Sequence, residues 1–286
     1  MWLFPFLSEP VSTVSSISSL KWGAELTGTV FGDEDIPLES GYIELIDNDD
    51  TFRDGVEITV ADNGDFSLTA PVAEDLHMFV RGPVNSGFVR INSQFFDVPN
   101  NISIDAGELE MITLSEVEAA LENFNTSYGL DIGEEDFTGI ALIGGSVDRL
   151  ECSDTSCSWK AAGGVSVGIT DSGGAPVEHY ILYAHDDNLE KNDNTFNNDG
   201  GFAILILGNE EDFPLDVTFT ADMSRPDAEN FVYDEVVQAR AYAYGSEAQG
   251  IVTAATIRVN YDMKQDVSLF FDDSDGGRCF ISSAKR

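Results

Sequence analysis

The amino-acid sequence predicts a mostly β chain made of two similar β-sandwiches in tandem, joined by one short helix. One pattern of residues occurs twice, and it carries this prediction. Each copy has a Thr-Gly strand start, a Gly-led alternating run and an Asn-Gly or Asp-Gly turn before a Phe; the copies lie at residues 27–66 and 138–202. Short strand-like runs separated by turn signals are typical of all-β sandwiches. The 286 residues suit two domains of ordinary size.

The first sandwich is expected at residues 24–114, after an apolar start and a Ser-rich tether at residues 1–23. Its strands are predicted by alternating or β-branched runs at residues 26–31, 42–46, 56–60, 66–68, 78–80, 88–91 and 107–114. Asn63-Gly64 predicts a two-residue hairpin turn, because both residues tolerate the positive φ that such a turn needs. Residues 1–7 are apolar, but the first basic residue is Lys21, so they do not form a complete secretory signal by themselves.

A helix is expected within the linking residues 115–130. Ser115 is a plausible N-cap that Glu118 would complete as a capping box. One apolar stripe at helical spacing is formed by Val117, Ala120, Leu121 and Phe124. Gly129 would end the helix. At roughly ten residues such a helix is marginal alone, so it is expected to pack on a sandwich and to set the angle between the domains.

The second sandwich is expected at residues 131–271, followed by a C-terminal tail at residues 272–286. Its strands are predicted at residues 140–143, 165–169, 180–183, 202–207, 217–220, 236–244, 251–259 and 267–271. Two polar insertions, at residues 152–157 and 186–194, distinguish this copy from the first one. Any specialised function is expected at these departures from the repeat.

The repeated pattern resembles the carboxypeptidase regulatory-like domain, a transthyretin-like (prealbumin-type) β-sandwich. The resemblance rests on the Thr-Gly strand start, the alternating strand after Gly41, the Asp-x-Gly-x-Phe motif at residues 62–66, and residues 105–114, and it is closer in the first copy. It implies an Ig-like, Greek-key sandwich of seven strands. It also implies a module that is extracellular, non-catalytic and attached to other surface modules.

The chain is strongly acidic. It has 52 Asp and Glu residues against 14 Lys and Arg residues, and its formal net charge is −38. Such a surface repels the phosphates of nucleic acids and anionic lipid headgroups. It suits cationic partners, divalent ions or solubility at high ionic strength. We therefore expect no nucleic-acid partner, and no segment is apolar over enough residues to predict a membrane span.

Cys152 and Cys157 are separated by four polar residues between two strand-like runs. This spacing can close a small disulfide loop across a hairpin. Two free thiols or a metal site are the alternatives, although zinc needs four ligands and no His is nearby. Cys279 has no evident partner in the sequence.

Acidic loops suggest calcium as the one candidate cofactor, because calcium binds six to eight oxygen ligands. The candidate ligands are Asp47, Asp49, Asp50 and Asp54 in a first cluster, Asp186, Asp187 and Asp193 in a second, and Asp273 and Asp275 in a third. In so acidic a chain, solvated polar loops are the alternative interpretation.

Four aromatic residues of the second half are candidates for an exposed face that binds a sugar or a protein: Phe231, Tyr233, Tyr242 and Tyr244. The alternative is that they line the core. The chain has no Gly-x-Ser-x-Gly motif and no Gly-rich phosphate loop. No residue is therefore assigned a catalytic role.

These observations predict a non-catalytic secreted or cell-surface module that acts in adhesion, as a spacer or in assembly. Its expected partner is a surface protein, a glycan or another copy of itself. The alternative is a ligand-binding module for carbohydrate, peptide or calcium that uses its loop tips or the tyrosine face. An enzyme whose site has no sequence signal is the third hypothesis.

Overall fold

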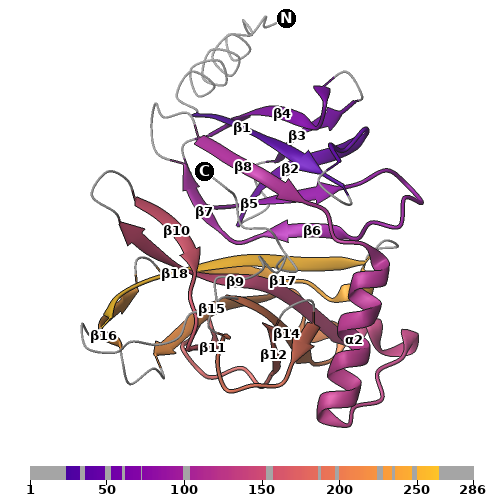
Figure 1. The fold of residues 1–286 in the computed structure, drawn as a ribbon. Helices are drawn as coiled ribbons and strands as arrows, with labels where there is room; N and C mark the ends of the chain where they lie inside the picture. The colour runs from indigo at the N-terminus through magenta and orange to yellow at the C-terminus, as the bar shows by residue number, and fades with distance from the viewer. Residues whose placement is uncertain are drawn as a thin grey trace, which may run out of the picture.

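The computed structural model describes residues 24–32, 36–48, 53–59, 62–71, 73–98, 104–152, 157–185, 188–196, 200–223, 228–233, 236–246 and 250–263. Within these residues the protein is mostly β, with one α-helix, α2 (Leu114–Tyr128), between two β-rich halves (Figure 1). Residues 24–110 are called the first half and residues 134–263 the second half. No helix in the described part of the chain is long and apolar enough to cross a membrane.

Eight strands form the first half: β1 (Ala24–Phe31), β2 (Gly41–Asp47), β3 (Arg53–Ile58), β4 (Asp65–Ala70), β5 (Ala73–Arg81), β6 (Arg90–Ser93), β7 (Phe96–Val98) and β8 (Ile104–Glu110). The turn before β4 has φ values of 53° at Asn63 and 79° at Gly64, the positive values that the sequence predicted. The predicted hairpin is wrong, however: β4 pairs with β1 and β3 pairs with β2, so the turn joins strands of two different sheets. β4 then alternates strictly between exposed and buried residues, as expected for a strand with one face on the core.

Ten strands form the second half: β9 (Ile140–Cys152), β10 (Cys157–Ala161), β11 (Val165–Asp171), β12 (Tyr180–His185), β13 (Asn188–Glu190), β14 (Gly201–Leu207), β15 (Leu215–Met223), β16 (Ala228–Tyr233), β17 (Gln238–Ala241) and β18 (Ile251–Met263). The predicted runs between residues 140 and 259 overlap β9, β11, β12, β14, β15, β17 and β18. The short strands β10, β13 and β16 were not predicted. The run expected at residues 267–271 lies outside the described residues.

One long strand joins the two halves. β18 lies between β9 of the second half and β6 of the first half, and it is parallel to both. The Cα partners of Val252, for example, are Leu142 on one side and Ile91 on the other. A 12-stranded sheet therefore runs through both halves, and two 3-stranded sheets, β4-β1-β8 and β11-β15-β17, complete the fold. The tandem pattern in the sequence did not predict this shared sheet.

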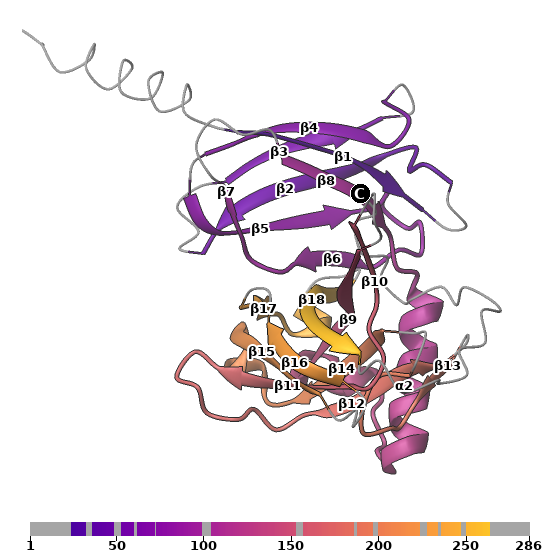
Figure 2. The ribbon, with the colours of Figure 1, turned by 60° about the vertical axis from the view of Figure 1, so that its left-hand side comes forward.

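The shared sheet is buried on both faces in the second half. Leu142 and Leu205 belong to a core that includes α2 and the first half, whereas their neighbours Ile143 and Ile204 belong to a second core with β11 and β15. Successive residues of a strand point to opposite faces, so these neighbours serve two different cores. Figure 2 shows α2 on one side of this part of the sheet.

The helix begins two residues earlier than the sequence predicted. Its N-cap is Thr113, whose Oγ1 accepts a hydrogen bond from the Glu116 backbone N–H at 3.3 Å, while the Glu116 carboxylate accepts one from the Thr113 backbone N–H at 2.7 Å. Thr113 and Glu116 therefore form the capping box that was assigned to Ser115 and Glu118. The predicted stripe is confirmed: the buried residues of α2 are Val117, Ala120, Leu121 and Phe124.

A polar clamp reinforces the contact between the halves. The Arg240 side chain, from β17, donates hydrogen bonds to both carboxylate oxygens of Asp216, at 2.7 and 3.1 Å. It also donates to the backbone oxygen of Asn48, at 3.0 Å, and to its side-chain oxygen. Asn48 follows β2 in the first half, and Asp216 lies on β15. Arg240 therefore connects three segments that are far apart in the sequence, and this group is called the Arg240 clamp.

Candidate functional site

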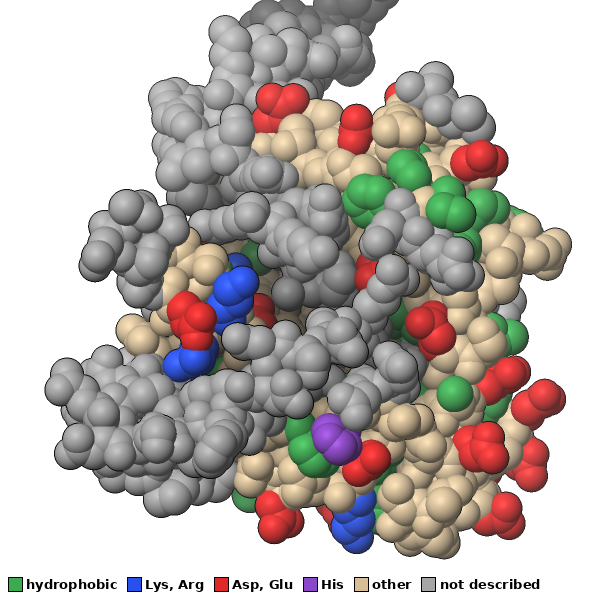
Figure 3. Space-filling model, viewed as in Figure 1, with side chains coloured by type: hydrophobic (Ala, Val, Ile, Leu, Met, Phe, Trp, Pro, Cys, Tyr) green, Lys and Arg blue, Asp and Glu red, His purple; other side chains and the backbone are tan. Residues whose placement is uncertain are grey.

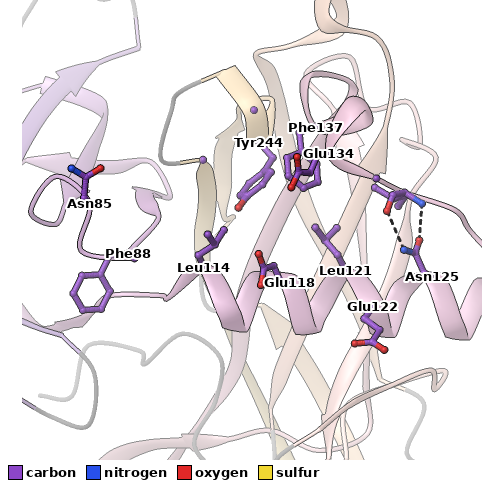
Figure 4. Close-up of a pocket in the computed structure, with 15 residues that line it drawn as sticks. Asn85, Phe88, Leu114, Glu118, Leu121, Glu122, Asn125, Glu134, Phe137 and Tyr244 are labelled. Carbon is purple, nitrogen blue, oxygen red and sulfur yellow. Dashed lines mark hydrogen bonds between the residues drawn. The ribbon is translucent and has the colours of Figure 1, made fainter.

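A groove opens where the first half, α2 and the second half meet, and it is called the junction groove. Its volume is about 620 Å³, which lies in the range of ordinary ligand pockets. The described residues that line it are Asn85, Gly87, Phe88, Leu114, Glu118, Leu121, Glu122, Asn125, Ile132, Gly133, Glu134, Phe137, Tyr244, Gly245 and Gly250. In Figure 4, Glu118 and Leu121 rise from α2 toward the aromatic rings of the second half, and Phe88 lies toward the other end.

Aromatic rings form the floor of the groove. Phe137 and Tyr244 meet edge to face, with ring centroids 4.9 Å apart. Gly250, with φ of 73°, brings the backbone against the Tyr244 ring, and a Cβ there would lie 2.5 Å from a ring carbon. Gly250 is therefore required both by its backbone conformation and by the lack of space. The Tyr244 ring is 3% exposed, so the surface that the floor offers to an apolar side chain comes mainly from Phe137.

One wall of the groove is fixed by a pair of reciprocal hydrogen bonds. The Ile132 backbone N–H donates to Oδ1 of Asn125 at 3.0 Å, and the Asn125 amide donates to the Ile132 carbonyl at 3.2 Å. Asn125 lies on α2 and Ile132 on the loop that follows it. These bonds, drawn as dashed lines in Figure 4, hold the loop that carries Glu134 against the helix.

The rim of the groove is acidic. Glu118, Glu122 and Glu134 are exposed carboxylates, and no Lys, Arg or His is found among the described residues that line the groove. Residues 91–148, which include α2 and its flanking loops, contain no Lys, Arg or His at all. Figure 3 shows acidic side chains gathered on the side of the molecule where Figure 1 places α2. The groove is thus an electrostatically negative site.

Tyr244 remains a neutral phenol in this setting. Burial raises its pKa to about 12, and the negative charge of Glu118 acts in the same direction. Its hydroxyl is therefore protonated throughout the physiological pH range. Among the described lining residues there is no Ser, Thr, Cys, Lys or His that could act as a nucleophile or as a base near neutral pH. The described groove offers apolar contact, hydrogen bonds and negative charge.

The structure describes the side chains of two of the four residues of the predicted aromatic face, Tyr242 and Tyr244. β17 ends at Ala241, before the end of the run predicted at residues 236–244, and a 3-10 turn, Tyr244–Ser246, follows it. The prediction of an exposed Tyr244 is wrong: the turn carries its side chain into the core, where it is 3% exposed. Tyr242 is half-buried, with its ring 5.3 Å from that of Phe79. The side chains of Phe231 and Tyr233 lie outside the description.

Most of the predicted calcium ligands also fall outside the described residues: Asp49, Asp50, Asp186, Asp187, Asp273 and Asp275. Asp47 ends β2, and Asp54 lies on β3, where its Oδ1 accepts a hydrogen bond from the Gly55 backbone N–H at 2.9 Å. Asp193 lies in a loop after β13. Within the described part of the chain, no three acidic, His or Cys side chains gather as a metal site. Calcium binding stays a prediction.

Cys157 is disulfide-bonded. The residue directly opposite it in the β9–β10 pair is Cys152. The side chain of Cys152 is outside the description, as is Cys279. The pairing of Cys152 with Cys157 stays the prediction of the sequence.

No known protein family and no curated protein matches the sequence. Among solved structures, the minor pilin GBS52 of Streptococcus agalactiae is 10% identical, with a TM-score of 0.27, over 86% of this chain and 100% of that one. A streptococcal ancillary pilin is 9% identical, with a TM-score of 0.21, over 82% of this chain and 62% of that one. The Bacillus anthracis TIE protein is 10% identical, with a TM-score of 0.25, over 84% of this chain, which spans 34% of that protein. Similarities this weak carry no argument about function.

Proposed function

We propose that this chain is a non-catalytic secreted or cell-surface module that acts in adhesion or assembly by holding a segment of a partner protein in the junction groove. The observation that carries the proposal is the combination of an apolar floor, where Phe137 packs on the buried ring of Tyr244, with a rim of three carboxylates. A groove of this kind fits a short segment that has an apolar anchor and flanking positive charges.

The origin of its walls supports a role in binding. Phe88 comes from the first half, Leu114 and Glu118 from α2, and Tyr244 from the second half. The groove is thus assembled only when the shared sheet has joined the halves. Sites between structural units are common places for ligands, because several elements can each contribute a side chain.

The compartment is part of the proposal. A disulfide at Cys157 supports an oxidising environment, such as the exterior of a cell. The Asn63-Gly64 turn, which passes from one sheet to the other, is in keeping with the resemblance of the first half to carboxypeptidase regulatory-like sandwiches. We propose that the two halves derive from such modules and have fused through β18.

A peptide-display experiment tests the function. A library of random short peptides is selected on the folded chain, and peptides that combine Lys or Arg with an aromatic or large aliphatic residue are expected to be enriched. The same peptides should bind at least about tenfold more weakly to Glu118→Lys/Glu122→Lys, a change of about 1.4 kcal/mol or more in binding free energy. A matched control is Glu25→Lys/Glu57→Lys, which makes the same change of charge at exposed positions of β1 and β3. Failure to enrich such peptides, or equal weakening by the control, would remove the proposal.

A further inference from the structure

We propose that the junction groove of one copy binds residues 278–286 of a second copy of this chain, so that the protein associates with itself head to tail. This inference rests on the proposed function of the groove and names the segment that the groove holds.

The sequence of this segment complements the groove. Residues 278–286, RCFISSAKR, carry Arg278, Lys285 and Arg286 and no acidic residue. No other stretch of nine residues in this chain has three basic side chains, although Asp and Glu outnumber Lys and Arg by 52 to 14. Phe280 and Ile281 supply the apolar anchor. The chain therefore contains one segment of the chemistry that the acidic, aromatic groove selects.

The size of the groove also fits this segment. Along α2 it extends from Leu114 to Asn125, which corresponds to about 16 Å at 1.5 Å per helical residue. An extended peptide rises about 3.3 Å per residue, so about five residues cover that length. Phe280 would pack against the accessible apolar side chains of the groove, Phe137 and Leu114, and Arg278 would then lie near the glutamates of α2. The remaining basic residues, Lys285 and Arg286, would extend beyond the end of the groove.

Chain geometry favours a second copy as the source of the segment. Gly250 lines the groove, and β18 leads away from it for 13 residues, or about 43 Å at 3.3 Å per residue. The fourteen residues 264–277 would have to cover that distance again, and fully extended they span at most about 50 Å. A return to the groove of the same copy would hold them near full extension, at a large cost in conformational entropy. A second copy imposes no such constraint.

The predicted contact is heterologous, because a groove on one copy meets a different segment on the next. Contacts of this type form rings when the rotation between copies closes, and open chains when it does not. A self-associating protein of this design would grow by adding copies, which is consistent with a role in assembly.

A charge-reversal experiment on the full chain tests the inference. All variants carry Cys279→Ser, so that a disulfide between copies cannot imitate the contact. The groove variant is Glu118→Lys/Glu122→Lys, and the tail variant is Arg278→Glu/Lys285→Glu/Arg286→Glu. Light scattering at low ionic strength, from micromolar to millimolar protein, should show association of the parent. Each variant alone should associate at least about tenfold more weakly. An equimolar mixture should associate again, because each basic segment then finds an acidic partner.

The outcomes are distinct. A parent that stays at the mass of one copy over this range overturns the inference, as does a mixture that remains monomeric. Glu25→Lys/Glu57→Lys is the matched control. If this control loses as much association as the groove variant, the inference is overturned, because the loss would then follow from the change in net charge alone. Phe280→Ser tests the anchor without changing the charge and should weaken association. If the parent is monomeric but still selects basic, apolar peptides from the library, the proposed function survives and only the identity of the segment is wrong.

Discussion

Replacing Arg240 by Met should destabilise the whole chain, because the Arg240 clamp holds the first half against the second. Met keeps most of the length of the apolar stem but removes every hydrogen bond to Asn48 and Asp216. The Arg240 side chain is 14% exposed and that of Asp216 is 37% exposed. After the substitution, the carboxylate can recover part of its hydration, whereas the guanidinium contacts with Asn48 have no replacement.

The expected loss is about 2–3 kcal/mol. A hydrogen bond that involves a charged group contributes about 1.5–3 kcal/mol, and the exposure of Asp216 reduces its share toward that of a surface ion pair. In a chain of this size, each kcal/mol shifts the melting temperature by roughly 2–4 °C, so the variant should melt about 4–12 °C lower. The control is Arg53→Met. The Arg53 side chain is 60% exposed and lies 3.2 Å from Glu44, so its loss should cost less than about 1 kcal/mol.

Calorimetry and a double-mutant cycle measure this effect. Because β18 pairs with both halves, the parent should unfold in one transition, and Arg240→Met should move that transition as a whole. A cycle with Asn48→Ala should give a coupling energy well above the ~0.5 kcal/mol expected of independent sites. Two separate transitions in the parent, only one of which responds to Arg240→Met, would refute the reasoning. Strict additivity of the two substitutions would refute the clamp itself.

Three further predictions concern the core and the helix. Burial raises the pKa of both Tyr183 and Tyr244 to about 12, against about 10 in an unfolded chain, so the unfolded state loses these protons first. Stability in urea should therefore be complete below about pH 10 and fall between pH 10 and 12, and Tyr183→Phe should reduce that fall. Phe124→Ala should cost about 3–5 kcal/mol in urea unfolding, because the side chain is 0% exposed, and a loss below ~1 kcal/mol would contradict its place in the core. Thr113→Ala should cost about 1 kcal/mol by the same measurement, whereas no loss would show that the capping box is dispensable.

The sequence predicts the local elements of this fold well. The helix stripe from Val117 to Phe124 and the Asn63-Gly64 turn follow from side-chain period and backbone preference, which are properties of neighbouring residues. The misplaced cap has a physical explanation. Thr113-x-x-Glu116 and Ser115-x-x-Glu118 are both capping-box sequences. Only the hydrogen bonds of the structure show that the first of them caps the helix.

The candidate site could not be predicted in the same way. Tyr244 was placed on an exposed strand face because its run alternates, but the strand ends at Ala241 and a turn buries the ring. The burial of Tyr244 depends on Phe137, which is distant in the sequence, and on Gly250, which lies in the loop before β18. One signal for the groove is nevertheless present in the sequence: the absence of any basic residue from residues 91–148. A stretch that keeps its negative charge without compensation over so many residues is a candidate wall for a cationic ligand.

The fusion of the halves also leaves a trace in the sequence once the two cores are known. A strand with one face in solvent alternates between apolar and polar residues, whereas a strand covered on both faces is apolar throughout. Residues 140–143 and 202–207, in β9 and β14, are continuous apolar runs, whereas β4 alternates. The continuous runs belong to the part of the sheet that α2 covers on one face and β11 and β15 on the other. In two separate sandwiches, each sheet would be covered on one face only, and its strands would not need to be apolar on both faces. The apolar runs therefore indicate that a helix packs on the sheet. This packing places Glu118 and Leu121 beside Tyr244 and creates the groove.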